Sequence, residues 1–176
     1  MRHRGFAALL LALALAAACG DDDDNPTGPS PLPTSFTLTS ALTPGNEVPP
    51  VTNADASGSG TVTITLAVTR DAAGAITGGT ANFSVTLTGF PANTTLTGAH
   101  IHRAPAGANA GVAVNTGLAN GEVVLATGAG SFTKNGVTVA ADLANALTTG
   151  ASGFYFNVHT TLNPGGAVRG QLALQQ

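Results

Sequence analysis

The chain has 176 residues, of which 6 are basic and 9 acidic, and its formal net charge is −3. Beyond Pro33 the acidic and basic residues nearly balance and form no basic stripe, which excludes a nucleic-acid-binding protein. The chain has 1 cysteine, so its folded part must be stable without a disulfide bond.

The first nineteen residues predict an export signal. A short basic start precedes an unbroken Ala/Leu run from Ala7 to Ala18, too short to span a bilayer comfortably and followed by polar sequence. Cys19 lies in the segment LALAAACG (13–20), which resembles the lipobox of bacterial lipoproteins, in which the cysteine is lipidated and becomes the new N-terminus. Ala16 stands where leucine is usual in that motif. The alternative is an ordinary secretory signal that contains a cysteine.

Residues 20–34 predict a linker. Their sequence contains four consecutive aspartates, which repel one another, and several proline and glycine residues, which prevent regular structure. A lipid on Cys19 would hold the following domain, residues 35–176, a short distance from a membrane. We therefore expect an exported protein, lipid-anchored in the bacterial cell envelope or otherwise secreted. The sequence identifies no protein partner.

The domain shows period-two alternation rich in threonine and valine. In TVTITLAVT (61–69), for example, aliphatic residues occupy one face and threonines the other. Turn-forming segments separate stretches of this kind. Strands are expected at residues 36–42, 61–69, 81–90, 96–102, 122–127, 153–160 and 167–174.

This spacing predicts an all-β fold, a Greek-key β-sandwich or barrel of about seven to eight antiparallel strands. One segment departs from the alternation. In VAADLANAL (139–147), apolar residues recur every four positions, which predicts one short helix.

Three histidines are predicted to share an outer sheet face. In GAHIHRAP (98–105), His100 and His102 lie two positions apart and project together. In GFYFNVHT (153–160), the apolar residues alternate with a polar set that includes His159. If these strands are neighbours, three neutral imidazoles converge, and such a set suits copper or zinc. The glycine-rich loop after His102 can fold over the site. The alternative is that these are ordinary polar residues on a solvent-facing strand surface.

Three further residues are predicted beside this site. Asn157 shares the histidine face, and Arg169 points outward from the last strand. Glu47 lies in the extended loop GNEVPPV (45–51). Asn157 has a simpler interpretation as a loop cap. A structural bond between Glu47 and Arg169 is favoured over a ligand role for Glu47. No nucleophile–base set or paired carboxylates are visible, so no catalytic residue is assigned and a non-enzymatic protein is favoured.

Four motifs, in order, resemble the CHRD domain, which is named after chordin and is common in exported bacterial proteins. They are EVPPV (47–51), GAHIHRAPAGANAGV (98–112), GFYFNVHT (153–160) and GGAVRGQL (165–172). The resemblance runs from about Phe36 to Leu174. It implies a domain and not a settled activity. Binding of growth factors by chordin does not transfer, because bacteria lack those ligands.

A weaker similarity links GAHIH, the later histidine and the final GG-plus-arginine strand to copper/zinc superoxide dismutases, whose copper ligands also lie outside a Greek-key barrel. This chain has too few histidines for a bridged metal pair, no evident zinc aspartate after His102, and no disulfide. The similarity supports the fold and a mononuclear site. The leading hypothesis is therefore a membrane-tethered domain that binds copper or zinc. The competing hypothesis is a metal-free adhesion or scaffold module, and a dismutase-like enzyme ranks last.

Overall fold

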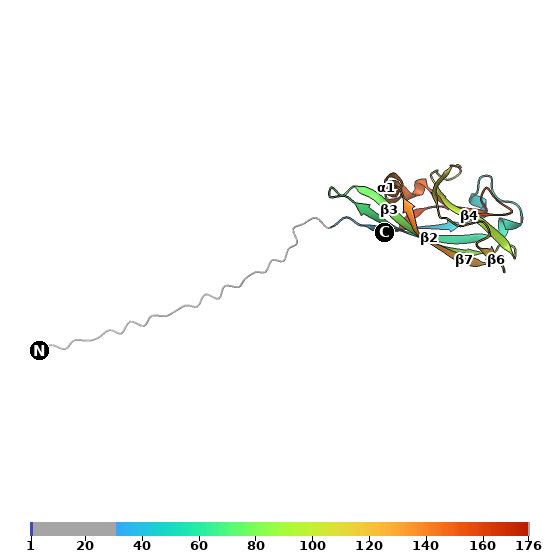
Figure 1. Cartoon of the computed structure of the whole chain (residues 1–176), viewed down its shortest axis with the longest axis horizontal. Coiled ribbons are helices and arrows are strands. Elements are labelled where there is room, and N and C mark those ends of the chain that lie inside the picture. Colours follow the sequence, from blue (N-terminus) through green and yellow to red (C-terminus); the bar gives the residue numbers. More distant parts are fainter. Residues whose placement is uncertain (2–30, 176) are drawn as a thin grey trace. The chain divides into compact units, whose positions relative to one another are not determined.

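The computed structural model describes Met1 and residues 31–175, and Figure 1 shows the arrangement of the elements. The predicted signal peptide, Cys19 and most of the predicted linker lie outside the described residues. Among the described helices, none is both long and apolar enough to cross a membrane.

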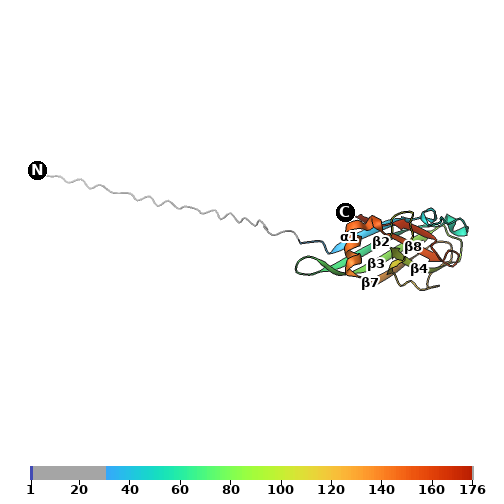
Figure 2. The ribbon, with the colours of Figure 1, turned by 90° about the horizontal axis from the view of Figure 1, so that it is seen from above.

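Within residues 31–175, ten strands form two antiparallel sheets that pack face to face (Figures 1 and 2). The first sheet has the order β10-β1-β2-β3-β7, and the second has the order β5-β4-β8-β9 with β6 paired to β4. The all-β sandwich expected from the alternation is thus confirmed. The strand bounds are β1 Ser35–Leu42, β2 Ser59–Arg70, β3 Ile76–Thr88, β4 Thr94–His102, β5 Val112–Asn115, β6 Val124–Leu125, β7 Gly130–Val139, β8 Tyr155–Thr160, β9 Val168–Gln171 and β10 Ala173–Gln175.

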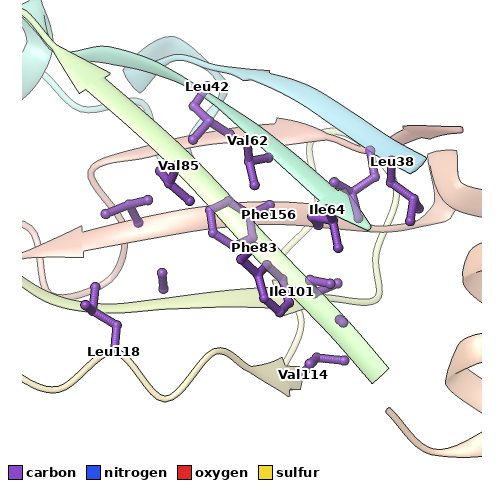
Figure 3. Close-up of a cluster of buried hydrophobic side chains, with 14 of the residues drawn as sticks. Leu38, Leu42, Val62, Ile64, Phe83, Val85, Ile101, Val114, Leu118 and Phe156 are labelled. Carbon is purple, nitrogen blue, oxygen red and sulfur yellow. The ribbon is translucent and has the colours of Figure 1, made fainter. Parts of the chain in front are cut away.

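The core lies between the sheets because alternate residues of each strand point inward. On β2, every second residue from Val62 to Val68 is buried, whereas the residues between them are exposed. The rings of Phe83 on β3 and Phe156 on β8 stack across the core with centroids 5.9 Å apart (Figure 3). This stack joins the two sheets at the centre of the sandwich.

The helix α1 spans Ala141–Gly150, close to the predicted position, and packs against β3 through Ala144 and Leu147. In the part of the chain that the structure describes, three short 3-10 helices complete the elements: η1 Pro44–Asn46, η2 Ala54–Ser57 and η3 Ala151–Gly153.

Three details of the strand prediction were wrong. The prediction missed β7, whose register against β3 shifts between Ala81 and Phe83, so that the alternation along β7 is interrupted. It also missed β5, which lies inside the stretch expected to be a loop. The last predicted strand, residues 167–174, divides into β9 and β10, and Leu174 in β10 is exposed.

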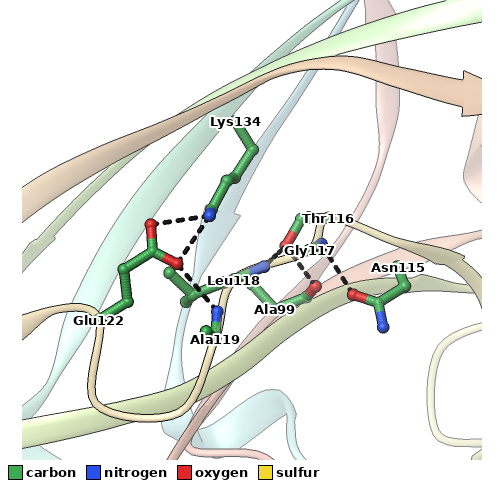
Figure 4. A network of polar contacts seen from close by, with 8 residues as sticks. All are labelled: Ala99, Asn115, Thr116, Gly117, Leu118, Ala119, Glu122 and Lys134. Carbon is green, nitrogen blue, oxygen red and sulfur yellow. Dashed lines mark hydrogen bonds and ion pairs between the residues drawn. The ribbon is translucent and has the colours of Figure 1, made fainter.

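The segment between β5 and β6 is held by a network of polar contacts (Figure 4). The Thr116 hydroxyl donates to the Ala99 carbonyl oxygen on β4 at 2.8 Å. Glu122 accepts from the Lys134 ammonium on β7 at 2.7 Å, and this hydrogen bond lowers the pKa of the Glu122 carboxyl. The loop therefore links the edge of the second sheet to the first.

Candidate metal centre

The strand register of the second sheet brings the three histidines together. His100 on β4 pairs with Asn157 on β8, and Asn157 pairs with Arg169 on β9. Two residues further along β4, His102 pairs with Tyr155, and two residues before His100, Gly98 pairs with His159. Residues two apart on a strand share a face, so the three imidazoles lie on one face of two adjacent strands. The predicted convergence of the histidines is confirmed.

The ring nitrogens of the cluster lie close together. One possible ligand atom from each of His100, His102 and His159 lies within 4.8 Å of the others. The shortest separation joins His100 Nδ1 to His159 Nε2 at 3.0 Å. Gly98 makes room for this arrangement, since a Cβ atom there would lie 3.1 Å from His100 Cε1.

Two backbone carbonyls determine the tautomers of two of the rings. His102 Nδ1 lies 2.9 Å from the Ala110 oxygen, and His159 Nδ1 lies 2.9 Å from the Pro164 oxygen. A carbonyl oxygen can only accept, so each Nδ1 carries the proton and donates it. In the neutral rings each Nε2 then carries a lone pair, and His100 Nδ1–H donates to His159 Nε2. Metal-binding histidines are oriented in this way by a backbone acceptor behind the ring.

Asn157 faces the second nitrogen of His102. The distance from its side-chain oxygen to His102 Nε2 is 3.1 Å. Because Nδ1 carries the proton in neutral His102, Nε2 can accept but not donate. A hydrogen bond with neutral His102 therefore requires the Asn157 amide to turn its NH₂ group towards Nε2. Asn157 thus covers the lone pair that a metal would use.

The pKa values of His100 and His159 favour neutral rings. Burial, followed by the nearby charges of His159 and His102, lowers the pKa of His100 to about 4. Burial is also the main cause that lowers the pKa of His159, against the hydrogen bond to Pro164, which raises it. Neutral imidazole is the form that binds a metal, so these shifts keep the ligand form populated at neutral pH.

The histidine face is not an open outer surface, as alternation alone indicated. His102 is 6% exposed, and Asn157 and Arg169 are each 1% exposed. The segment 103–111 covers them: it supplies the Ala110 oxygen to His102, and it supplies the Asn109 side-chain oxygen to Arg169 at 2.9 Å. The glycine-rich loop therefore lies over part of the site, as the sequence suggested it could.

The predicted bond between Glu47 and Arg169 is wrong. Within residues 31–175 the only ion pair within 4.0 Å joins Lys134 to Glu122. The Arg169 guanidinium is held instead by Asn109 and the Ala108 oxygen, and it stacks 4.1 Å from the centre of the Tyr155 ring. Asn109 and Ala108 in the covering loop therefore accept two of its hydrogen bonds, and Glu47 forms no ion pair with it.

Sequence reasoning missed three contributors to the site. Tyr155 stacks on His102 with ring centroids 4.7 Å apart. Ala110 and Pro164 contribute only backbone oxygens, so their side chains carry no signal for this role. Alternation places Tyr155 on the same face as Asn157 and His159, but nothing in the sequence indicated its contact with His102.

The comparisons with known proteins agree with the motifs. The family model described as CHRD domain matches residues 38–172. No curated protein and no solved structure matches the chain. The matched range runs from within β1 to just past the end of β9 and contains all three histidines.

Proposed function

The chain belongs to the CHRD domain family, and from that premise we propose that its domain binds one copper or zinc ion through His100, His102 and His159. One observation carries the proposal. Backbone oxygens orient His102 and His159 from behind, so that the Nε2 atom of each ring is free of its proton, and both rings belong to the same cluster. A purely structural role for these histidines does not require this shared tautomer.

The spacing of the nitrogens supports a shared ion. Two nitrogens that bind one tetrahedral zinc ion at about 2.0–2.1 Å lie about 3.3–3.4 Å apart. His100 Nδ1 and His159 Nε2 lie 3.0 Å apart, close to that value. To bind the ion through Nδ1, His100 must carry its ring proton on Nε2 instead. Its lowered pKa keeps the ring neutral, so only this change of tautomer is required.

A bound ion would supply Lewis acidity and, for copper, electron transfer. Three protein ligands leave a further position for water or another molecule. Asn157 would leave the His102 nitrogen and lie beside the ion, where a side chain tunes the ligands without binding the metal. No reaction is assigned, because within residues 31–175 no nucleophile–base set lies beside the histidines.

The proposal also includes location. The lipobox-like end at Cys19 supports lipid anchoring in a bacterial envelope, and the acidic linker would hold the domain away from the membrane. The Cys19→Ser variant should be released from membranes or remain unprocessed, which detergent partitioning and mass spectrometry measure. Wild-type protein recovered wholly in the soluble fraction, with its N-terminus at another residue, would contradict anchoring.

A metal-free adhesion or scaffold module is the second candidate. It is favoured by the hydrogen bonds of the cluster, which already pair both nitrogens of His102 and both nitrogens of His159. In that case the histidines are a buried polar network that orients the covering loop, and the binding surface lies elsewhere.

Calorimetric titration of the full chain with Zn²⁺ and Cu²⁺ separates the two candidates. Metal binding predicts that each of His100→Ala, His102→Ala and His159→Ala weakens affinity severely. Asn157→Ala should weaken it less, by about tenfold to a hundredfold. Thr63→Ala, on the exposed face of the other sheet, is the matched control and should bind as the wild type does. Equal affinity of the wild type and the triple alanine variant would overturn the proposal.

A further inference from the structure

A second group of polar side chains lies beside the histidine cluster and plays no part in it. Two cavities of about 400 Å³ and 350 Å³ adjoin the segments 45–53, 106–109 and 162–166 and strand β9. Glu47 lines both cavities, and Arg169 lines the larger one. Volumes of this size are typical of sites for small molecules.

Glu47 is buried without the partners that a buried carboxyl group usually has. The residue is 5% exposed, and its Oε1 atom has no hydrogen-bond partner within residues 31–175. The carboxyl group lies against Gly166, where an added Cβ atom would come within 2.5 Å of Oε1. Burial raises the pKa of Glu47 to about 7, against the charge of Arg169, which lowers it. An unpaired buried carboxyl group is costly and calls for a cationic or donor partner.

Arg169 offers the complementary charge on the wall of the larger cavity. Its guanidinium has five N–H donors, and within residues 31–175 only Asn109 and Ala108 supply acceptors to it. The stack on Tyr155 and these two bonds hold the group in place. The remaining donors suit a carboxylate, which guanidinium binds in a planar geometry.

We propose that the cavity lined by Glu47 and Arg169 binds an α-amino acid or a similar small zwitterion, with its carboxylate on Arg169 and its ammonium group on Glu47. Both charged groups line the larger cavity, interact electrostatically and lie more than 4.0 Å apart, so one ligand that carries both charges can contact each of them. A simple anion would be repelled by the carboxylate of Glu47, and a simple cation would be repelled by the guanidinium of Arg169. A zwitterion satisfies both.

The rest of the cavity suits the uncharged part of such a ligand. Val48, Pro50 and Ala106 line it with apolar surface, next to Gly45 and Gly107, which have no side chains. None of the three histidines lines either cavity. Binding of a zwitterion therefore does not depend on the proposed metal, and the two proposals can fail separately.

The test is calorimetric titration of the full chain, treated with a chelator, with glycine, L-alanine and L-leucine. At least one of these amino acids should bind. Its N-acetyl derivative, which lacks the ammonium group, and its amide, which lacks the carboxylate, should each bind about tenfold more weakly or worse, because each loses a hydrogen bond to a charged group. Affinity should rise as the pH rises through about 7 and Glu47 ionises. Arg169 is the only other charged residue that lines either cavity, and His159 reaches the smaller cavity only through Pro164.

Variants of Glu47 and Arg169 test which charged group of the ligand each residue binds. Glu47→Gln keeps the shape of the side chain and should abolish the preference for the free amine over the N-acetyl form. Glu122→Gln removes an exposed carboxyl group elsewhere and should bind as the wild type does. Arg169→Lys should weaken binding of the carboxylate, with circular dichroism confirming that the variant folds. The proposal is overturned if none of the three amino acids binds, if the N-acetyl form binds equally well, or if Glu47→Gln changes nothing.

Discussion

The two sheets of the sandwich share one core, but their outer faces differ in solvent exposure. On β2 of the first sheet, Thr61, Thr63 and Thr65 alternate with buried aliphatic residues and are exposed. On β8 of the second sheet, Tyr155 and Asn157 occupy equivalent alternate positions but are 3% and 1% exposed. The first sheet is therefore covered on one side only, whereas the second is also covered over part of its outer face.

This difference shows what the alternation of apolar and polar residues along a strand can predict. It identifies which side chains face the other sheet, but it does not show whether the opposite face is wet. On the second sheet a loop adds a further layer, and the polar groups beneath it lose water. Each buried polar group then needs a hydrogen-bond partner. His102 and Arg169 donate to backbone oxygens of this loop. Buried polar groups with defined partners are the setting in which a binding site can be built.

The largest expected effect concerns the core that the two sheets share. Phe156→Ala and Phe83→Ala should each lower the free energy of unfolding by about 3–5 kcal/mol, because each removes half of the stack between the sheets. Denaturant unfolding measures both changes. Similar losses would confirm that the inner faces are equivalent. A loss below about 1 kcal/mol at either position would contradict the packing of the core.

The outer faces should respond unequally to loss of a side chain. Arg169→Ala should cost about 2–4 kcal/mol, since it removes the stack on Tyr155 and leaves the acceptors of Asn109 and Ala108 unpaired. Thr65→Ala, at an exposed position of the first sheet, should change stability by less than about 0.5 kcal/mol. Chemical denaturation of both variants checks the contrast. If the two losses were equal, the covering loop would contribute nothing to the second sheet.

The same contrast explains how much could be predicted. Alternation predicted most strands of the first sheet, because these strands have one buried and one exposed face. It did not predict β7, whose register against β3 shifts and whose alternation is interrupted. The facing of His100, His102 and His159 also followed from alternation, and their strands proved to be neighbours. The covering of that face could not be predicted, because Ala108, Ala110 and Pro164 act through backbone oxygens, which no side chain reveals.

The smallest expected effect is a dependence of stability on pH that arises in the second sheet. The folded pKa of His100 is about 4, below its reference value of 6.5, so between these values the unfolded chain binds more protons than the folded one. Stability should therefore fall as the pH drops from 6.5 towards 4. Glu47 acts in the opposite direction. Its folded pKa is about 7 against a reference of 4.5, so its contribution to stability falls as the pH rises through that range.

Two variants separate these opposing contributions. In the presence of a chelator, His100→Gln should lose less stability than the wild type between pH 6.5 and 4, because it no longer carries the depressed histidine. Glu47→Gln should lose more, since the contribution that offsets the histidine is gone. Thr63→Ala, on the exposed face of the first sheet, should follow the wild-type curve. Thermal melts across the pH range measure all four proteins. If the His100→Gln curve ran parallel to the wild-type curve, the ring would not be held neutral by its surroundings, and the second sheet would titrate no differently from the first.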